Sequence, residues 1–125
     1  MDDLPTPTPR ELEILKVLWE LGPRSVTAVH KAIRPAGGKV LAPNTVQTLL
    51  RIMEGKGLVT HAESGRTFLY RPLFSREESA SRFLDRVFDG AASQLVSSLL
   101  KAERIPPAEL EQLRQLINQA RKPTP

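Results

Sequence analysis

The sequence contains no cysteine, so the chain can form neither a disulfide nor a thiolate metal site. It also has no apolar run near the roughly 18 residues of a membrane-spanning helix, and we expect no membrane insertion. Its start, MDDLPTPTPR, is acidic and proline-rich, whereas a secretory signal is basic and then apolar. These absences predict a cytoplasmic protein.

Side chains that could support catalysis are few and scattered. His30 and His61 fall on different predicted elements, and no cysteine is present to complete a transition-metal site. Ser98 and Lys101 match the S-x-x-K motif of penicillin-interactive enzymes, but neither S-D-N nor K-T-G accompanies it. The Gly-Lys-Gly stretch 55–57 is too short for a phosphate-binding loop. We therefore predict no catalytic site, metal or cofactor.

Positive charge is concentrated in the middle of the chain. Residues 24–71 hold eight Lys or Arg and two Glu, a net charge of +6, while the whole chain of 125 residues carries +4. Such a segment favours a polyanionic partner such as nucleic acid, the alternative being an ordinary solvated basic face. The length fits one domain, or a small domain with an oligomerisation extension.

Two helices are predicted at the N-terminal end. Thr8 and, three residues later, Glu11 form a capping box, and the helix that it opens ends near Leu21, before a Gly-Pro pair. A second short helix is expected over residues 28–34, with Thr27 as its cap.

A third helix follows the glycine-containing loop 35–42. It is expected to run from Pro43 to about Lys56, with Gly57 as its left-handed cap. Apolar residues spaced i, i+3, i+4 and i+7 predict one buried face, made of Val46, Leu49, Leu50 and Met53.

After Gly57 the apolar period changes from 3.6 to 2, which predicts a small β-hairpin. We place its turn at Ser64 and Gly65. The candidates for one face of the hairpin are Leu58, Thr60, Phe68 and Tyr70. The order helix, short strand, helix, helix, hairpin is that of a winged helix-turn-helix, so the fold class is mainly α with a small β-hairpin.

The last third of the chain is predicted to be three amphipathic helices, opened by a second capping box from Ser75 to Glu78. A winged helix over residues 8–74 is too small to bury all their apolar stripes, so we expect residues 75–122 to be a helical dimerisation region. A monomer that folds these helices back on itself is the alternative. The predicted dimerisation residues are Phe83, Leu84, Val87, Phe88, Leu95, Val96, Leu99, Leu100, Leu110, Leu113, Leu116 and Ile117. Residues 1–7 and 123–125 are expected to be tails.

The outward side of the third helix carries hydroxyls, amides and a guanidinium, which are groups that hydrogen-bond base edges and phosphates. The hairpin tip adds Arg66, for which an ordinary turn arginine is the alternative. The predicted DNA-binding residues are Asn44, Thr45, Gln47, Thr48, Arg51, Lys56 and Arg66. A winged helix that uses the same surface to bind a protein, without sequence-specific DNA binding, is the alternative function.

Several stretches, taken in order, carry a family resemblance. They are ELEILKVLWELGPRSVTAVHKAI, PNTVQTLLRIMEGKGLV, GRTFLYRPLFSREE, FLDRVFDG and AELEQLRQLI. Across residues 10–121 this order and spacing resemble the BlaI/MecI-type penicillinase repressors. The W-E-x-G-P turn at 19–23 and T-V-x-T-L-L at 45–50 are the most specific parts.

The resemblance implies a dimeric winged-helix repressor that binds a palindromic operator and represses nearby promoters, often of β-lactamase or penicillin-binding-protein genes. It also implies relief by a membrane sensor protease that cleaves in the dimerisation region, at a segment that aligns with Ser98 and Leu99. The copper-responsive branch of the family uses a cysteine cluster that this chain lacks. Relatives often carry arginine at the position of Ile52, whereas Arg51 here stands one residue earlier, about 100° around the helix.

Overall fold

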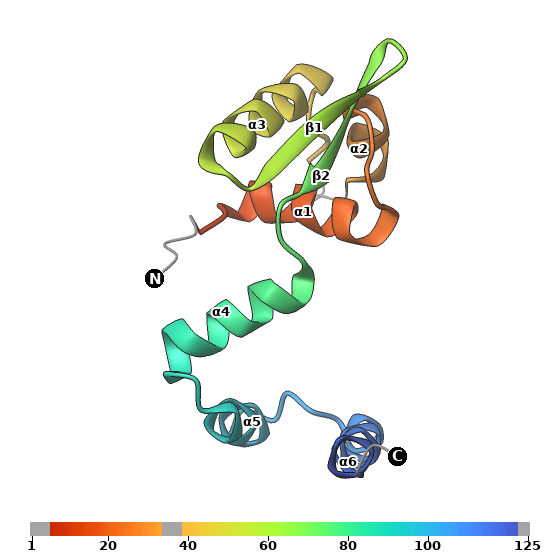
Figure 1. The fold of residues 1–125 in the computed structure, drawn as a ribbon. Coiled ribbons are helices and arrows are strands. Elements are labelled where there is room, and N and C mark those ends of the chain that lie inside the picture. The colour runs from red at the N-terminus through yellow and green to blue at the C-terminus, as the bar shows by residue number, and fades with distance from the viewer. Residues whose placement is uncertain (1–5, 34–38, 123–125) are drawn as a thin grey trace. The chain divides into compact units, whose positions relative to one another are not determined.

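The computed structural model describes residues 6–33 and 39–122, which form six helices and one two-stranded antiparallel sheet (Figure 1). The chain divides into two compact units, Met1–Ser79 and Ala80–Pro125, with the boundary inside α4, Arg76–Phe88. The predicted domain limits remain predictions. Most of the predicted tails, and part of the predicted glycine-containing loop, lie outside the described residues.

Helix α1, Pro9–Leu21, begins with the predicted capping box. The Thr8 hydroxyl accepts a hydrogen bond from the Glu11 N–H at 3.2 Å, and the Glu11 carboxylate accepts one from the Thr8 N–H at 2.8 Å. The helix ends at Gly22, whose φ of 82° lies in the region that favours glycine. Both ends of α1 are therefore set by local sequence.

Helix α2, Val26–Ala32, begins earlier than predicted. The Ser25 hydroxyl accepts a hydrogen bond from the Ala28 N–H at 3.1 Å, so Ser25 is the N-cap and the expectation of Thr27 was wrong. The reason lies one residue upstream. Arg24 exchanges two backbone hydrogen bonds with Tyr70, at 3.0 and 2.8 Å, so the extended chain gives way to helix directly at Ser25.

Helix α3, Pro43–Lys56, has the predicted limits, and Gly57 caps it in the left-handed conformation with φ 82°. Three of the four residues predicted for its inner face are fully buried, and Leu49 is half-buried. The helical period was therefore sufficient to identify the face of α3 that packs on the core.

Strands β1, Val59–Ser64, and β2, Thr67–Pro72, form the predicted hairpin, but the turn is one residue further along than expected. Ser64 pairs with Thr67, so the two turn residues are Gly65 and Arg66. Gly65 has a φ of 64°, which a glycine adopts without strain.

The pairing of the two strands shows which hairpin residues share a face. His61 pairs with Tyr70, and the His61 ring contacts the rings of both Phe68 and Tyr70. Phe68 and Tyr70 therefore lie on the face of His61, and the expectation that they share a face with Thr60 was wrong. Directly opposed residues of an antiparallel pair lie on one face, so Thr60 shares its face with its partner Arg71.

One hydrophobic core holds α1, α2, α3 and the hairpin together. Its apolar residues come from every element of this unit and continue into the segment that follows β2. They are Ile14, Leu15, Val17, Leu18, Val29, Ile33, Val46, Leu50, Met53, Leu58, Val59, Tyr70 and Phe74. The hairpin tip extends past the ends of α2 and α3 (Figure 1).

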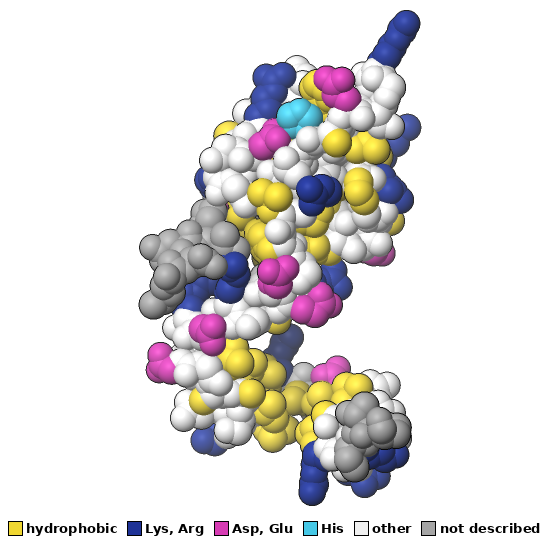
Figure 2. Space-filling view, viewed as in Figure 1, with side chains coloured by type: hydrophobic (Ala, Val, Ile, Leu, Met, Phe, Trp, Pro, Cys, Tyr) yellow, Lys and Arg dark blue, Asp and Glu magenta, His cyan; other side chains and the backbone are white. Residues whose placement is uncertain are grey.

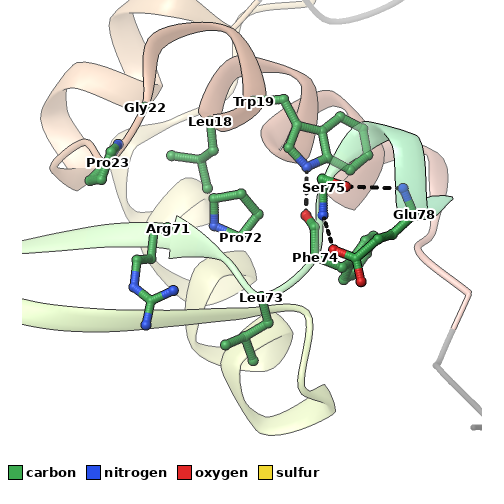
Figure 3. Close-up of a pocket in the computed structure, with 10 residues that line it drawn as sticks. All are labelled: Leu18, Trp19, Gly22, Pro23, Arg71, Pro72, Leu73, Phe74, Ser75 and Glu78. Atoms are coloured by element: carbon green, nitrogen blue, oxygen red, sulfur yellow. Dashed lines mark hydrogen bonds between the residues drawn. The ribbon is translucent and has the colours of Figure 1, made fainter. Parts of the chain in front are cut away.

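Trp19 fixes the segment that leaves β2. Its indole N–H donates to the Phe74 carbonyl at 2.9 Å, and the two rings meet edge to face with centroids 6.0 Å apart (Figure 3). The second capping box, between Ser75 and Glu78, follows at once, with two hydrogen bonds of 3.0 Å. The start of α4 is thus tied to α1.

The C-terminal unit contains the rest of α4, together with α5, Ala92–Lys101, and α6, Pro107–Arg121. None of its described residues is buried, and its apolar side chains gather at the surface (Figure 2). Leu116 is 60% exposed and Ile117 is 55% exposed. Within the part of the chain that the structure describes, no helix is long and apolar enough to cross a membrane.

We expect Ser25→Ala to lower the free energy of unfolding by about 1 kcal/mol, because the Ala28 N–H loses its partner. Thr27→Ala is the matched control and should change it by less than about 0.5 kcal/mol. Urea unfolding followed by the fluorescence of Trp19, the one tryptophan of the chain, measures both. Equal losses in the two variants would contradict the assignment of Ser25 as the cap.

Candidate nucleic-acid interface

Helix α3 exposes one continuous polar side. All five residues that were predicted to face outward are exposed: Asn44, Thr45, Gln47, Thr48 and Arg51. The opposite side is buried in the core through Val46, Leu50 and Met53. The winged-helix unit therefore holds α3 by its apolar side and leaves amides, hydroxyls and a guanidinium available to a ligand.

The hairpin is attached to α3 by a histidine and a glutamate. His61 Nδ1 lies 2.8 Å from each carboxylate oxygen of Glu54. Arg51 precedes Glu54 by three residues, so it lies on the same flank of α3. Burial raises the pKa of the Tyr70 phenol, the negative charge of Glu54 adds to the effect, and the positive charge of Arg51 opposes it. Arg51 is thus exposed on the flank of α3 whose Glu54 binds the hairpin.

The other predicted arginine, Arg66, occupies the second position of the hairpin turn and is exposed. Glu63 is nearby on the same hairpin and is also exposed. The structure thus places Arg66 at the tip of the hairpin, where its side chain has room to reach a partner. Its contact with nucleic acid remains a prediction.

Lys56, the remaining predicted DNA contact, makes a bond inside the unit. Its ammonium donates to both carboxylate oxygens of Glu11, at 3.0 and 2.9 Å. The Glu11 residue is only 1% exposed. Sequence reasoning found the capping role of Glu11 but missed this pair, because no local pattern links residues 45 positions apart. A direct contact of Lys56 with DNA remains a prediction.

The charge of Glu11 is stabilised by its partners. Burial alone would raise the pKa of this carboxyl, but hydrogen bonds from the Thr8 backbone N–H and from the Lys56 ammonium outweigh burial, and the pKa is lowered. A charged glutamate therefore joins the first turn of α1 to the last turn of α3. The pair limits how far α3 can rotate or slide on the core.

The exposed charges of this unit are mixed, with an excess of positive side chains (Figure 2). Over residues 24–71, one of the two acids, Glu54, is engaged by His61. Exposed Lys and Arg in the same segment include Lys39, Arg51, Arg66 and Arg71. This excess of positive charge suits a polyanionic partner such as the phosphate backbone of nucleic acid.

A shallow hollow of about 440 Å³ lies between the end of α1, the end of β2 and the start of α4 (Figure 3). Arg71 and Glu78 are the two ionisable residues that line it, and Glu78 already accepts the Ser75 N–H. Its other side chains are mostly apolar. The hollow offers no pair of nucleophile and base.

The S-x-x-K residues Ser98 and Lys101 are both exposed on α5. Among the described residues, no three His, Asp or Glu side chains are close enough together to hold a metal ion. The most developed surface for a ligand is thus the polar side of α3.

Comparison with known proteins identifies relatives along the whole chain. Residues 7–119 match the family described as Penicillinase repressor. The penicillinase repressor of Bacillus licheniformis is 27% identical, over 95% of this chain and 94% of that protein. The methicillin resistance regulatory protein MecI of Staphylococcus aureus (strain N315) is 23% identical, over 86% of this chain and 89% of that one.

Solved structures agree with these matches. The solution structure of the DNA binding domain of the repressor BlaI is 29% identical, with a TM-score of 0.51, over 62% of this chain and 93% of that domain. A MarR family protein from Bacillus stearothermophilus, 24% identical with a TM-score of 0.50, shares the fold over 92% of this chain and 76% of its own. The winged-helix fold that the sequence predicted is confirmed.

The lowered pKa of Glu11 predicts how stability depends on pH. The unfolded chain binds the proton more readily, so the contribution of Glu11 is complete above the ordinary pKa of 4.5 and is lost as the pH falls through the lower folded value. Glu11→Gln should lower the free energy of unfolding at pH 7 by about 1–3 kcal/mol, because the hydrogen bonds to a charged group are lost.

Thermal unfolding between pH 7 and pH 3 tests this prediction. Glu11→Gln should flatten the acid dependence of stability relative to the wild type. Glu20→Gln, at an exposed position on the same helix, should leave that dependence in place. The prediction is wrong if both variants follow the wild-type curve.

Proposed function

This chain belongs to the penicillinase repressor family of winged-helix DNA-binding transcriptional regulators, and we propose that it represses transcription as a homodimer on a palindromic operator. The observation that carries the proposal is the exposed polar side of α3, held in place by the buried apolar side. In proteins with a helix-turn-helix, the second helix of the motif enters the major groove. We assign that position to α3. The family is one of repressors, not enzymes.

Each side chain on this surface suits a particular contact. Asn44 and Gln47 carry amides that match the edge of adenine, and Arg51 can fork to a guanine edge or hold a phosphate. Thr45 suits a phosphate or a thymine methyl group. Arg66, at the hairpin tip, is assigned to the flanking backbone or the minor groove.

Dimerisation is assigned to the C-terminal unit. Its helices bury none of their described residues, and twelve apolar positions along them lie at or near the surface. A second copy of the chain would cover these stripes and remove apolar area from water. Two-fold symmetry then requires a palindromic operator, with half-sites about one or two helical turns apart.

Repression would follow from occupancy, because a dimer on a promoter excludes RNA polymerase. We place this action in the cytoplasm and at nearby genes, with β-lactam-response genes as the first candidates. Release by a membrane sensor protease is proposed at Ser98 and Leu99 of α5. A cut there would weaken the dimer and lower the effective concentration of the second DNA-binding unit.

We expect the full chain to shift DNA from its own upstream region in a gel at low salt. Binding should weaken steeply between about 50 and 200 mM salt, because bound counterions are released from the phosphates. Arg51→Ala should cost about 1–3 kcal/mol of binding free energy and relax the preference at one base position. Arg121→Ala, at an exposed position at the end of α6, is the control.

Absence of any shift at low salt would overturn DNA repression as the function. DNA binding that does not weaken as the salt concentration rises would contradict a contact with the phosphates. A protein partner held by apolar contacts, the alternative that the sequence left open, would bind almost equally well at both salt concentrations. A loss in Arg51→Ala that is equal on all DNA sequences would make Arg51 a phosphate contact.

For the dimer, we expect Leu113→Asp or Leu99→Asp to separate the subunits, because each would bury a carboxylate in an apolar seam. Gln112→Asp adds the same charge on the polar side of α6 and should leave the dimer intact. Sedimentation velocity measures the state of all three. An unchanged dimer in both leucine variants would move the interface away from these positions.

A further inference from the structure

Ile52 is an apolar residue on the exposed part of α3. It is 46% exposed, whereas the apolar residues of the buried side of this helix, such as Val46 and Leu50, are fully buried. A β-branched side chain loses rotamer freedom in a helix, so isoleucine is not favoured there by helix propensity. The packing of this unit therefore gives Ile52 only part of the burial that an isoleucine can gain.

Two threonines lie on the same line along α3. Ile52 follows Thr48 by four residues and Thr45 by seven, so the three side chains form one strip along the helix. We call Thr45, Thr48 and Ile52 the methyl strip, because each of them carries a γ-methyl group. Both threonines are exposed.

Neither the hairpin nor the position of Gly55 covers the methyl strip. Glu54, which binds His61 of the hairpin, is two residues from Ile52 and thus about 200° around α3, so the hairpin contacts the opposite flank. Gly55 is exposed on the neighbouring side, and a Cβ built there would meet no atom within 4 Å. Nothing at Gly55 covers Ile52.

We propose that the methyl strip contacts the C5-methyl groups of thymine in the major groove, and that Ile52 makes each half-site prefer thymine at one position. This inference rests on the proposed function. Thymine is the one base whose major-groove edge carries an apolar group, and threonine methyl and apolar side chains contact it. The other bases present polar atoms that Ile52 would desolvate without a hydrogen bond. A phosphate gains nothing from an alkyl side chain.

The strip is continuous with the polar residues assigned to DNA. Arg51 precedes Ile52, and Thr48 is common to both sets. Arg51 and Gln47 lie on the flank of α3 that is nearer to the hairpin. When that flank is in the major groove, the methyl strip on the other flank of α3 faces the bases or the backbone. The face of α3 is thereby divided into a hydrogen-bonding half and a methyl-bearing half.

The experiment begins with the full chain and a library of random duplex DNA, from which the preferred site is selected. Each thymine of that site is then replaced by deoxyuridine, which lacks only the C5-methyl group. At one position per half-site the wild type should lose about fourfold in affinity, the equivalent of one buried methyl group. Ile52→Ala should bind more weakly and lose clearly less on the same replacement.

Two further variants make the comparison specific. Ile52→Val keeps the branched shape and should show an intermediate effect of deoxyuridine. Leu21→Ala removes an exposed apolar side chain at the end of α1 and should keep the full wild-type effect. Thermal unfolding of each variant establishes that the winged helix is folded.

The possible results separate this inference from the proposed function. If the wild type selects no DNA sequence, the proposed function fails. If it selects a site but deoxyuridine costs the same in the wild type and in Ile52→Ala, the proposed function stands and the thymine contact is wrong. A uniform loss of binding in Ile52→Ala over all sequences also overturns it, because Ile52 would then lie on the sugar-phosphate backbone.

Discussion

The burial of one side of α3 determines what the other side can do. Val46, Leu50 and Met53 are fully enclosed by the core, so the helix cannot rotate without exposing them. Two polar links act at its C-terminal half: Lys56 binds the buried Glu11, and Glu54 binds His61 of the hairpin. A helix that reads DNA has to present its side chains in a fixed orientation, and these contacts provide it.

Local signals in the sequence predicted the elements, and long-range contacts produced the differences. Pro43 and Gly57 mark the ends of α3 by their own conformations, so those limits were right. The cap of α2 was misplaced because two hydroxyl residues, Ser25 and Thr27, stand near its start, and only the pairing of Arg24 with Tyr70 selects the first. The hairpin turn was misplaced by one residue for a similar reason, since register depends on the partner strand.

The sequence was sufficient to predict the exposed part of the candidate site, but not the contacts that hold α3 in place. The polar side of α3 follows from periodicity, and the structure exposes all of it. The pair of Glu11 and Lys56 joins the start of α1 to the end of α3 across a distance in sequence that no pattern spans. Lys56 illustrates the limit: as a surface lysine it resembles a phosphate contact, yet its ammonium also neutralises a buried carboxylate.

The two units differ in how far each buries its own apolar side chains. This difference bears on how a repressor of this kind would be controlled. The described residues 6–33 and 39–79 enclose a core of their own, whereas the described residues 80–122 bury none of theirs. The DNA-binding unit can therefore keep its fold when the dimer is lost, because its core includes no residue beyond Phe74. A single unit has only one helix and one hairpin tip to offer to DNA. In the proposed dimer, the affinity of this unit for DNA would depend on a second unit held nearby, so a change confined to α5 and α6 would release DNA and leave the proposed DNA-binding surface folded.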